Sequence, residues 1–161
     1  MRRILFILLS TVVMLPACQE ARKSPHETVS NGNIKITYGR PYKKGRDIFG
    51  GLEKYGKVWR TGADEATEIT FSKDVSFAGK PVKAGTYSLF TIPAPQNWTI
   101  ILNSETGQSG LEYKQNRDLL RVEVPSKKLD HTVEQFTFQL EANAIVMEWD
   151  KTQVTIPVVV Q

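Results

Sequence analysis

The sequence has few of the residues that build metal centres and disulfide frameworks. Among 161 residues it contains one cysteine and two histidines, His26 and His131. A single cysteine excludes a disulfide framework within the chain and a cysteine-rich zinc site, and two histidines argue against a multi-histidine metal centre. The glycine-rich fingerprints of phosphate-binding and dinucleotide-binding loops are also missing. We therefore expect neither a metal nor a cofactor.

No apolar run in the sequence is long enough to cross a bilayer as a helix, which takes about 20 residues. The longest, from Ile4 to Leu15, follows Arg2 and Arg3 and has the pattern of a secretory signal peptide. It ends in Leu15-Pro16-Ala17-Cys18, which resembles the bacterial lipoprotein cleavage box, in which the cysteine is acylated and becomes the new N-terminus. The alternative is an ordinary signal peptide that happens to contain a cysteine.

These features predict a signal peptide over 1–17, a polar tether over 18–30 that starts at a lipidated Cys18, and one domain over 31–161. Acyl chains hold a protein firmly in a membrane, because each buried methylene contributes about 0.8 kcal/mol. We therefore expect an exported protein anchored in the cell envelope through Cys18. Gln19, rather than Asp, follows the cysteine, which favours the outer membrane facing the periplasm if sorting follows the enterobacterial rule.

Charge gives no sign of a nucleic-acid partner. The formal charge of +4 falls to +2 when Arg2 and Arg3 leave with the signal peptide. So small an excess does not provide the basic footprint that nucleic-acid binding needs.

From Asn33 onward, apolar and polar side chains alternate with a period of two, as in half-buried strands. Ile34, Ile36 and Tyr38 share one face of the first strand. The pattern recurs at 69–71, 75–77, 120–124, 136–140, 145–149 and 154–160. Regular turns and the lack of a convincing amphipathic helix predict an all-β fold. We expect an antiparallel β-sandwich or a jelly-roll-like barrel of about eight or nine strands.

The alternation stops between Gly39 and Thr67, in a long segment rich in glycine and arginine. It holds six of the 11 glycines, and positions 39–60 contain seven basic and two acidic residues, a net charge of +5. Aromatic residues are interleaved with the charges. Long irregular segments in compact domains are usually functional. Arginine forks suit carboxylate or phosphate oxygens, and aromatic faces suit sugar rings or apolar groups.

Two interpretations of this segment remain open. In the first, its arginines pair with neighbouring acids and its apolar side chains plug the core, so that the loop is structural. In the second, the loop carries a ligand site. The candidate ligand-binding residues are Arg40, Arg46, Trp59, Arg60 and Glu65.

The same segment resembles a known family, domain-of-unknown-function family 2911. The matching stretches are 39–41 (GRP), 44–52 (KGRDIFGGL), 55–67 (YGKVWRTGADEAT), 84–93 (AGTYSLFTIP) and 98–103 (WTIILN). The resemblance implies a secreted or lipoprotein-like bacterial domain of the Bacteroidetes type, and it carries no established activity. Where the family pattern often has Asn before the Glu, this chain has Asp64.

Catalytic signals are weak. Asp64 and Glu65 are adjacent, so on a strand they would point to opposite faces and form a poor carboxyl pair for glycoside hydrolysis. No nucleophile elbow accompanies the two histidines. The sequence thus favours a non-catalytic envelope lipoprotein that binds a small or glycan-like ligand, including an anionic one, through the 39–67 loop. Two alternatives stay open: an envelope interaction or structural module of unknown protein partner, and a hydrolase using Glu65.

Overall fold

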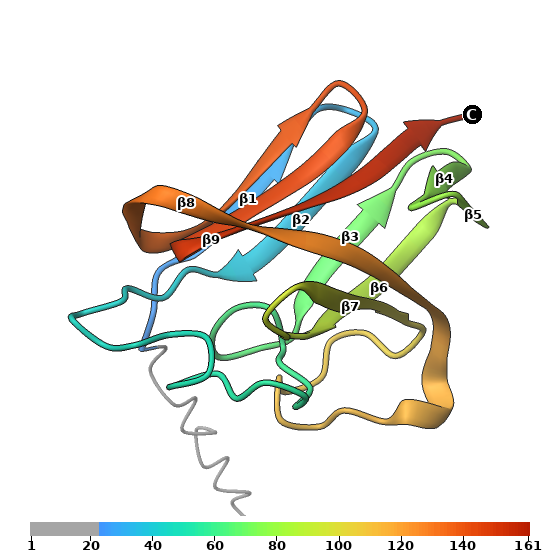
Figure 1. The fold of residues 1–161 in the computed structure, drawn as a ribbon. Coiled ribbons are helices and arrows are strands. Elements are labelled where there is room, and N and C mark those ends of the chain that lie inside the picture. Colours follow the sequence, from blue (N-terminus) through green and yellow to red (C-terminus); the bar gives the residue numbers. More distant parts are fainter. Residues whose placement is uncertain (1–22) are drawn as a thin grey trace, which may run out of the picture.

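The computed structural model describes residues 23–161, so the predictions for the signal peptide and for Cys18 lie outside the described residues. Nine strands form one sheet in the order β1-β2-β3-β6-β7-β8-β9-β4-β5, and every pairing is antiparallel (Figure 1). The all-β prediction of eight or nine antiparallel strands is confirmed. Helix within 23–161 is limited to one 3₁₀ turn, η1 (Gln115–Arg117), and no helix there has the length and hydropathy to span a membrane.

The strands vary in length from three to 24 residues. They are β1 (His26–Ser30), β2 (Ile34–Gly39), β3 (Thr67–Phe71), β4 (Val75–Phe77), β5 (Lys80–Val82), β6 (Gly85–Ile92), β7 (Asn97–Asn103), β8 (Asp118–Glu141) and β9 (Ala144–Val160).

Strand β1 lies within the stretch that the sequence predicted to be a tether. It pairs with β2 from His26 opposite Gly39 to Ser30 opposite Lys35. Its side chains are half-buried or exposed, as on a sheet edge, so its apolar pattern is too weak to be seen in the sequence. The last five residues of the predicted tether therefore form an edge strand of the sheet.

Strands β8 and β9 are each continuous, although each contains two stretches of alternating apolar side chains that the sequence analysis treated as separate strands. In β9 the core side chains have odd numbers up to Trp149 and even numbers from Val154. Asp150, at a φ of 54°, lies between them. An extra residue in a strand shifts the alternation by one and moves the following side chains to the other face. In β8, two register shifts lie on either side of Val133, and the core side chains have even numbers both before and after them.

The curled sheet encloses one large apolar core (Figure 1). Its largest fully buried side chains include Tyr38, Phe71, Trp98, Phe136 and Trp149, which come from β2, β3, β7, β8 and β9. Burying each such side chain contributes roughly 1.5–3 kcal/mol. A smaller cluster, centred on Phe90 and Ile101, lies on the other face of β6 and β7.

Candidate functional site

The segment from 40 to 66 is the long irregular loop that the sequence predicted, and it crosses one end of the curled sheet (Figure 1). Backbone hydrogen bonds fasten it to three strands. The Lys43 N–H donates to the Glu134 carbonyl of β8 at 2.7 Å. Trp59 and Thr91 of β6 exchange two bonds, of 2.7 and 2.9 Å, and the Ala63 N–H donates to the Gly39 carbonyl at 3.2 Å. The loop is therefore held in one conformation at several points along its length.

Apolar side chains of the loop complete the core of the domain. Ile48 is 1% exposed and Trp59 is 4% exposed. The Phe49 ring packs between Trp59, at 5.7 Å, and Trp98, at 4.6 Å. The Trp59 indole N–H donates to the Gly62 carbonyl at 3.2 Å. Trp59, a predicted ligand contact, thus supports the loop from inside and does not offer its ring to solvent.

Arg40 is engaged by neighbouring strands. Its Nη1 lies 2.9 Å from the Glu27 carboxylate of β1. Its Nε donates to the Phe136 carbonyl at 3.1 Å, and its Nη2 donates to the Thr137 hydroxyl at 2.9 Å. Arg40 therefore ties β1 and β8 to the end of β2.

Arg46 and Arg60 are in a different situation. Arg46 is exposed, and its side chain donates to the backbone carbonyls of Lys43 at 2.9 Å and Tyr42 at 2.5 Å. Arg60 is half-buried, and its Nε lies 3.4 Å from the Gly62 carbonyl. Within residues 23–161, neither guanidinium has an ion-pair contact with a carboxylate. Both therefore keep charge that a ligand could neutralise.

Glu53 lies within electrostatic range of these two arginines, and the sequence analysis did not identify it as a site residue. Its side chain is half-buried, and burial raises the pKa of its carboxyl. The positive charges of Arg60 and Arg46 act in the opposite direction on the same pKa. All three groups thus share one electrostatic neighbourhood. The signal in the sequence is that Glu53 is one of only two acids within the basic stretch 39–60.

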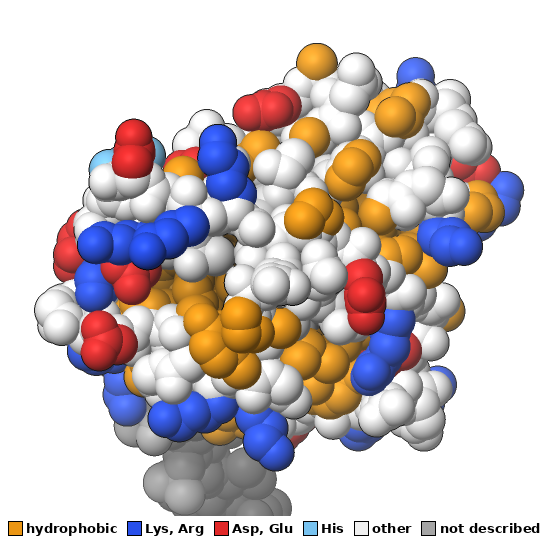
Figure 2. Space-filling view, in the orientation of Figure 1, with side chains coloured by type: hydrophobic (Ala, Val, Ile, Leu, Met, Phe, Trp, Pro, Cys, Tyr) orange, Lys and Arg blue, Asp and Glu red, His pale blue; other side chains and the backbone are white. Residues whose placement is uncertain are grey.

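Exposed apolar side chains gather on the same loop. Of the seven large hydrophobic residues that are exposed in the described chain, four lie here: Tyr42, Leu52, Tyr55 and Val58, at 38–45% exposure. The Tyr55 ring lies against Gly50, where a Cβ would come within 2.7 Å of it. Figure 2 shows hydrophobic surface across the lower middle of this view, with lysine and arginine along its lower margin. We call Tyr42, Arg46, Glu53, Tyr55 and Arg60 the loop surface.

Glu65, another predicted ligand residue, lies beside β1. Its Oε2 is 2.8 Å from the His26 Nε2, and the neighbouring Asp64 carboxylate accepts a hydrogen bond from the Ser24 N–H at 3.2 Å. Its backbone forms an isolated bridge with Ser109. The described residues contain no group of three or more His, Cys, Asp or Glu side chains that could hold a metal ion.

A family model described as "Protein of unknown function (DUF2911)" matches residues 20–158. The chain belongs to this family. The DUF2911 match covers β1 through most of β9 and therefore includes the whole loop. No curated protein and no solved structure matched the chain.

Proposed function

We propose that this DUF2911 protein is a non-catalytic lipoprotein of the cell envelope, whose loop surface binds an anionic glycan. The observation that carries the proposal is the pair Arg46 and Arg60, which have no ion-pair contact with a carboxylate among residues 23–161 and whose charges act to lower the pKa of the half-buried Glu53. Hydrogen bonds to charged groups contribute about 1.5–3 kcal/mol each, so the N–H donors that these two guanidinium groups still have available give an anionic ligand substantial affinity.

The aromatic residues of the loop surface suit a sugar. Tyr42 and Tyr55 are 41% and 45% exposed, close to the two arginines in sequence. A tyrosine ring offers an apolar face to a sugar ring and a hydroxyl to its polar substituents. Backbone hydrogen bonds and buried side chains hold the loop in one conformation, so these groups are already ordered before a ligand binds. This order lowers the entropic cost of binding.

The contacts of Glu65 favour binding over hydrolysis. Glu65 is in contact with His26, and Asp64 accepts a bond from Ser24, so both acids fasten the start of the domain. A Glu65→Gln variant would test the hydrolase alternative. If turnover on any active substrate is lost in that variant while the fold is retained, the non-catalytic proposal is wrong.

The binding proposal is tested by calorimetry with an oligogalacturonate as the anionic probe and a cello-oligosaccharide of equal length as the neutral one. We expect Arg46→Ala and Arg60→Ala each to weaken oligogalacturonate binding about tenfold, which corresponds to about 1.4 kcal/mol. Arg117→Ala, a change at an exposed arginine on η1, is the matched control and should leave binding unchanged. Equal affinity for the neutral probe, or an unchanged affinity in the Arg46→Ala/Arg60→Ala double variant, would contradict the proposal.

The lipid anchor has a separate test. Expressed with labelled palmitate, the protein should carry the label and sediment with membranes, because acyl chains hold it there. Cys18→Ser should abolish both. If the label persists in that variant, or the parent protein is never labelled, the anchor is not at Cys18.

A further inference from the structure

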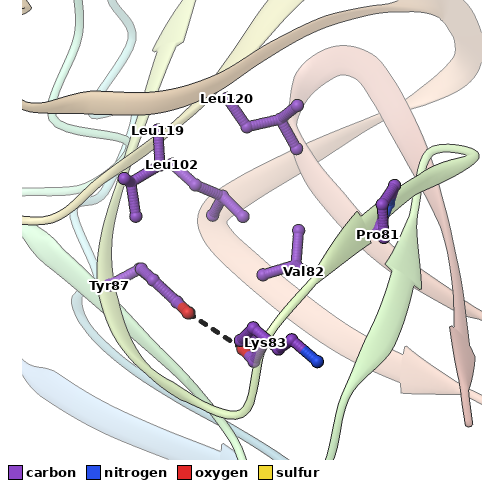
Figure 3. A pocket seen from close by; sticks show the side chains of 7 residues that line it. All are labelled: Pro81, Val82, Lys83, Tyr87, Leu102, Leu119 and Leu120. Carbon is purple, nitrogen blue, oxygen red and sulfur yellow. Dashed lines mark hydrogen bonds between the residues drawn. The ribbon is translucent and has the colours of Figure 1, made fainter.

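A hollow lies where the curled sheet fails to close. Within residues 23–161, strand β5 is an edge strand paired with β4 alone, and its Pro81 and Val82 line a hollow together with residues of β6, β7 and β8. A hollow of about 180 Å³ opens there, and Figure 3 shows Leu102 and Leu120 facing Val82 across it, with the Tyr87 ring along one side. The β4–β5 hairpin stands at the right of Figure 1, away from the loop surface at the lower left.

The walls of this hollow are a continuation of the core. Val82, Tyr87 and Leu120 are partly buried side chains packed against the main core cluster. Leu102 at the base is 1% exposed, whereas Leu119 at the rim is 60% exposed. The Tyr87 hydroxyl already donates to the Lys83 carbonyl at 2.9 Å, so its one donor is used. What the hollow offers a ligand is therefore hydrocarbon surface.

The mouth of the hollow carries a cation. The Lys83 side chain is 86% exposed and its Nζ lies 2.7 Å from the Asp74 carboxylate. An ammonium group has three N–H donors, of which this contact uses one. An adjoining hollow of about 200 Å³ shares Pro81, Val82 and Lys83 with the first and is also lined by Asp74 and Gln161. Lys80 is also exposed on β5, so the two lysines of this hairpin outnumber Asp74 by one positive charge.

We propose that this hollow binds the alkyl chain of an anionic amphiphile, a medium-chain alkanoate, with its carboxylate on the Lys83 ammonium. An apolar cavity of about 150 Å³ is large enough for benzene, so 180 Å³ accommodates a short length of alkyl chain. The combination of apolar walls with two lysines, Lys80 and Lys83, against the one carboxylate of Asp74 favours a ligand with an apolar tail and a single negative charge. The site shares no residue with the loop surface, so failure of one proposal would leave the other unaffected.

The test is calorimetric titration with decanoate and, as an opposite-charge probe of the same chain length, decyltrimethylammonium, both below their aggregation concentrations. Decanoate should bind at least tenfold more tightly than the cation. Leu119→Glu should weaken decanoate binding at least tenfold, because it places a negative charge at the apolar rim. Lys83→Gln should remove the preference for decanoate.

Matched controls are Val159→Glu, at another exposed apolar position, and Lys128→Gln, at another exposed lysine. Both should bind decanoate as the parent does, and so should the Arg46→Ala/Arg60→Ala variant. Unfolding midpoints establish that each variant is folded. If Leu119→Glu does not fold, the preference measured in Lys83→Gln still tests the proposal. Absence of decanoate binding, equal binding of the cation, or an unchanged preference in Lys83→Gln would overturn the proposal.

Discussion

Gly39 and Ala63 approach each other where β2 ends and the loop returns to the sheet. A Cβ at position 39 would lie 2.0 Å from the Ala63 carbonyl oxygen, a distance at which backbone atoms must move. Gly45, by contrast, has a φ of 71° and no atom within 4 Å of such a Cβ. The two glycines therefore serve different purposes, close approach and turn geometry.

We expect Gly39→Ala to destabilise the protein by about 3 kcal/mol, because overpacking against backbone has no easy relief. Gly45→Ala should cost about 1–2 kcal/mol, the penalty of a left-handed conformation for an alanine. Urea unfolding measures both. Equal losses of free energy in the two variants would show that Gly39 does not clamp the loop.

Glu53 makes the stability of the loop depend on pH. Burial raises the pKa of its carboxyl in the folded state above the unfolded value. The folded state therefore binds its proton more tightly, and this stabilising contribution, present at low pH, is lost as pH rises through the folded pKa. At neutral pH the ionised carboxylate is a net cost to the fold.

Glu53→Gln should therefore raise the free energy of unfolding near pH 7 by roughly 0.5 kcal/mol, the size typical of changes near a surface. Near pH 3, where the carboxyl is protonated, the variant and the parent should be equally stable. Thermal unfolding at the two pH values checks this. A variant less stable than the parent near pH 7 would mean that attraction to Arg46 and Arg60 outweighs the cost of burial.

Among the elements, the loop 40–66 depends most on its core contacts. Trp59 stacks on Trp149 at 5.8 Å and packs edge-on against Phe136 at 5.0 Å. These rings come from β9 and β8, so a single loop residue joins strands distant in sequence. The same indole bonds Gly62, which fixes the turn that leads back to β3.

Trp59→Ala should cost about 3–5 kcal/mol, as large-to-small changes in aromatic cores do. Leu52→Ala, at a loop residue that is 44% exposed, should change stability by less than about 0.5 kcal/mol. Denaturant unfolding compares the two. A loss below about 1 kcal/mol in Trp59→Ala would mean that the loop is only loosely seated on the core.

The elements also show what the sequence could and could not predict. Alternation identified the faces of β2, β3 and β9, because each has one face in the core. It divided β9 at Asp150, because a bulge reverses which residues point inward. It missed β1, an edge strand with little apolar surface, and with it Glu27, the partner that occupies Arg40. Ion pairs between segments distant in sequence cannot be found from local composition.

For the molecule as a whole, charge is concentrated at one end. The chain carries a formal +4, or +2 without Arg2 and Arg3, and positions 39–60 carry +5, so the remainder carries −1 or −3. Such an asymmetry draws anionic ligands toward the loop surface. Because exposed charges are screened by salt, raising the ionic strength from about 0.01 to about 1 M should weaken oligogalacturonate binding markedly. Calorimetry at the two salt concentrations measures this; an affinity independent of salt would exclude a charge-driven site.

The most direct test of the central proposal is an NMR titration of the ¹⁵N-labelled protein with oligogalacturonate, following the backbone amides. The account predicts that the largest shifts fall within residues 42–60, around Arg46, Tyr55 and Arg60, and that they disappear in the Arg46→Ala/Arg60→Ala variant. Shifts centred instead on β5 to β8, or scattered over the sheet with the loop unaffected, would contradict it.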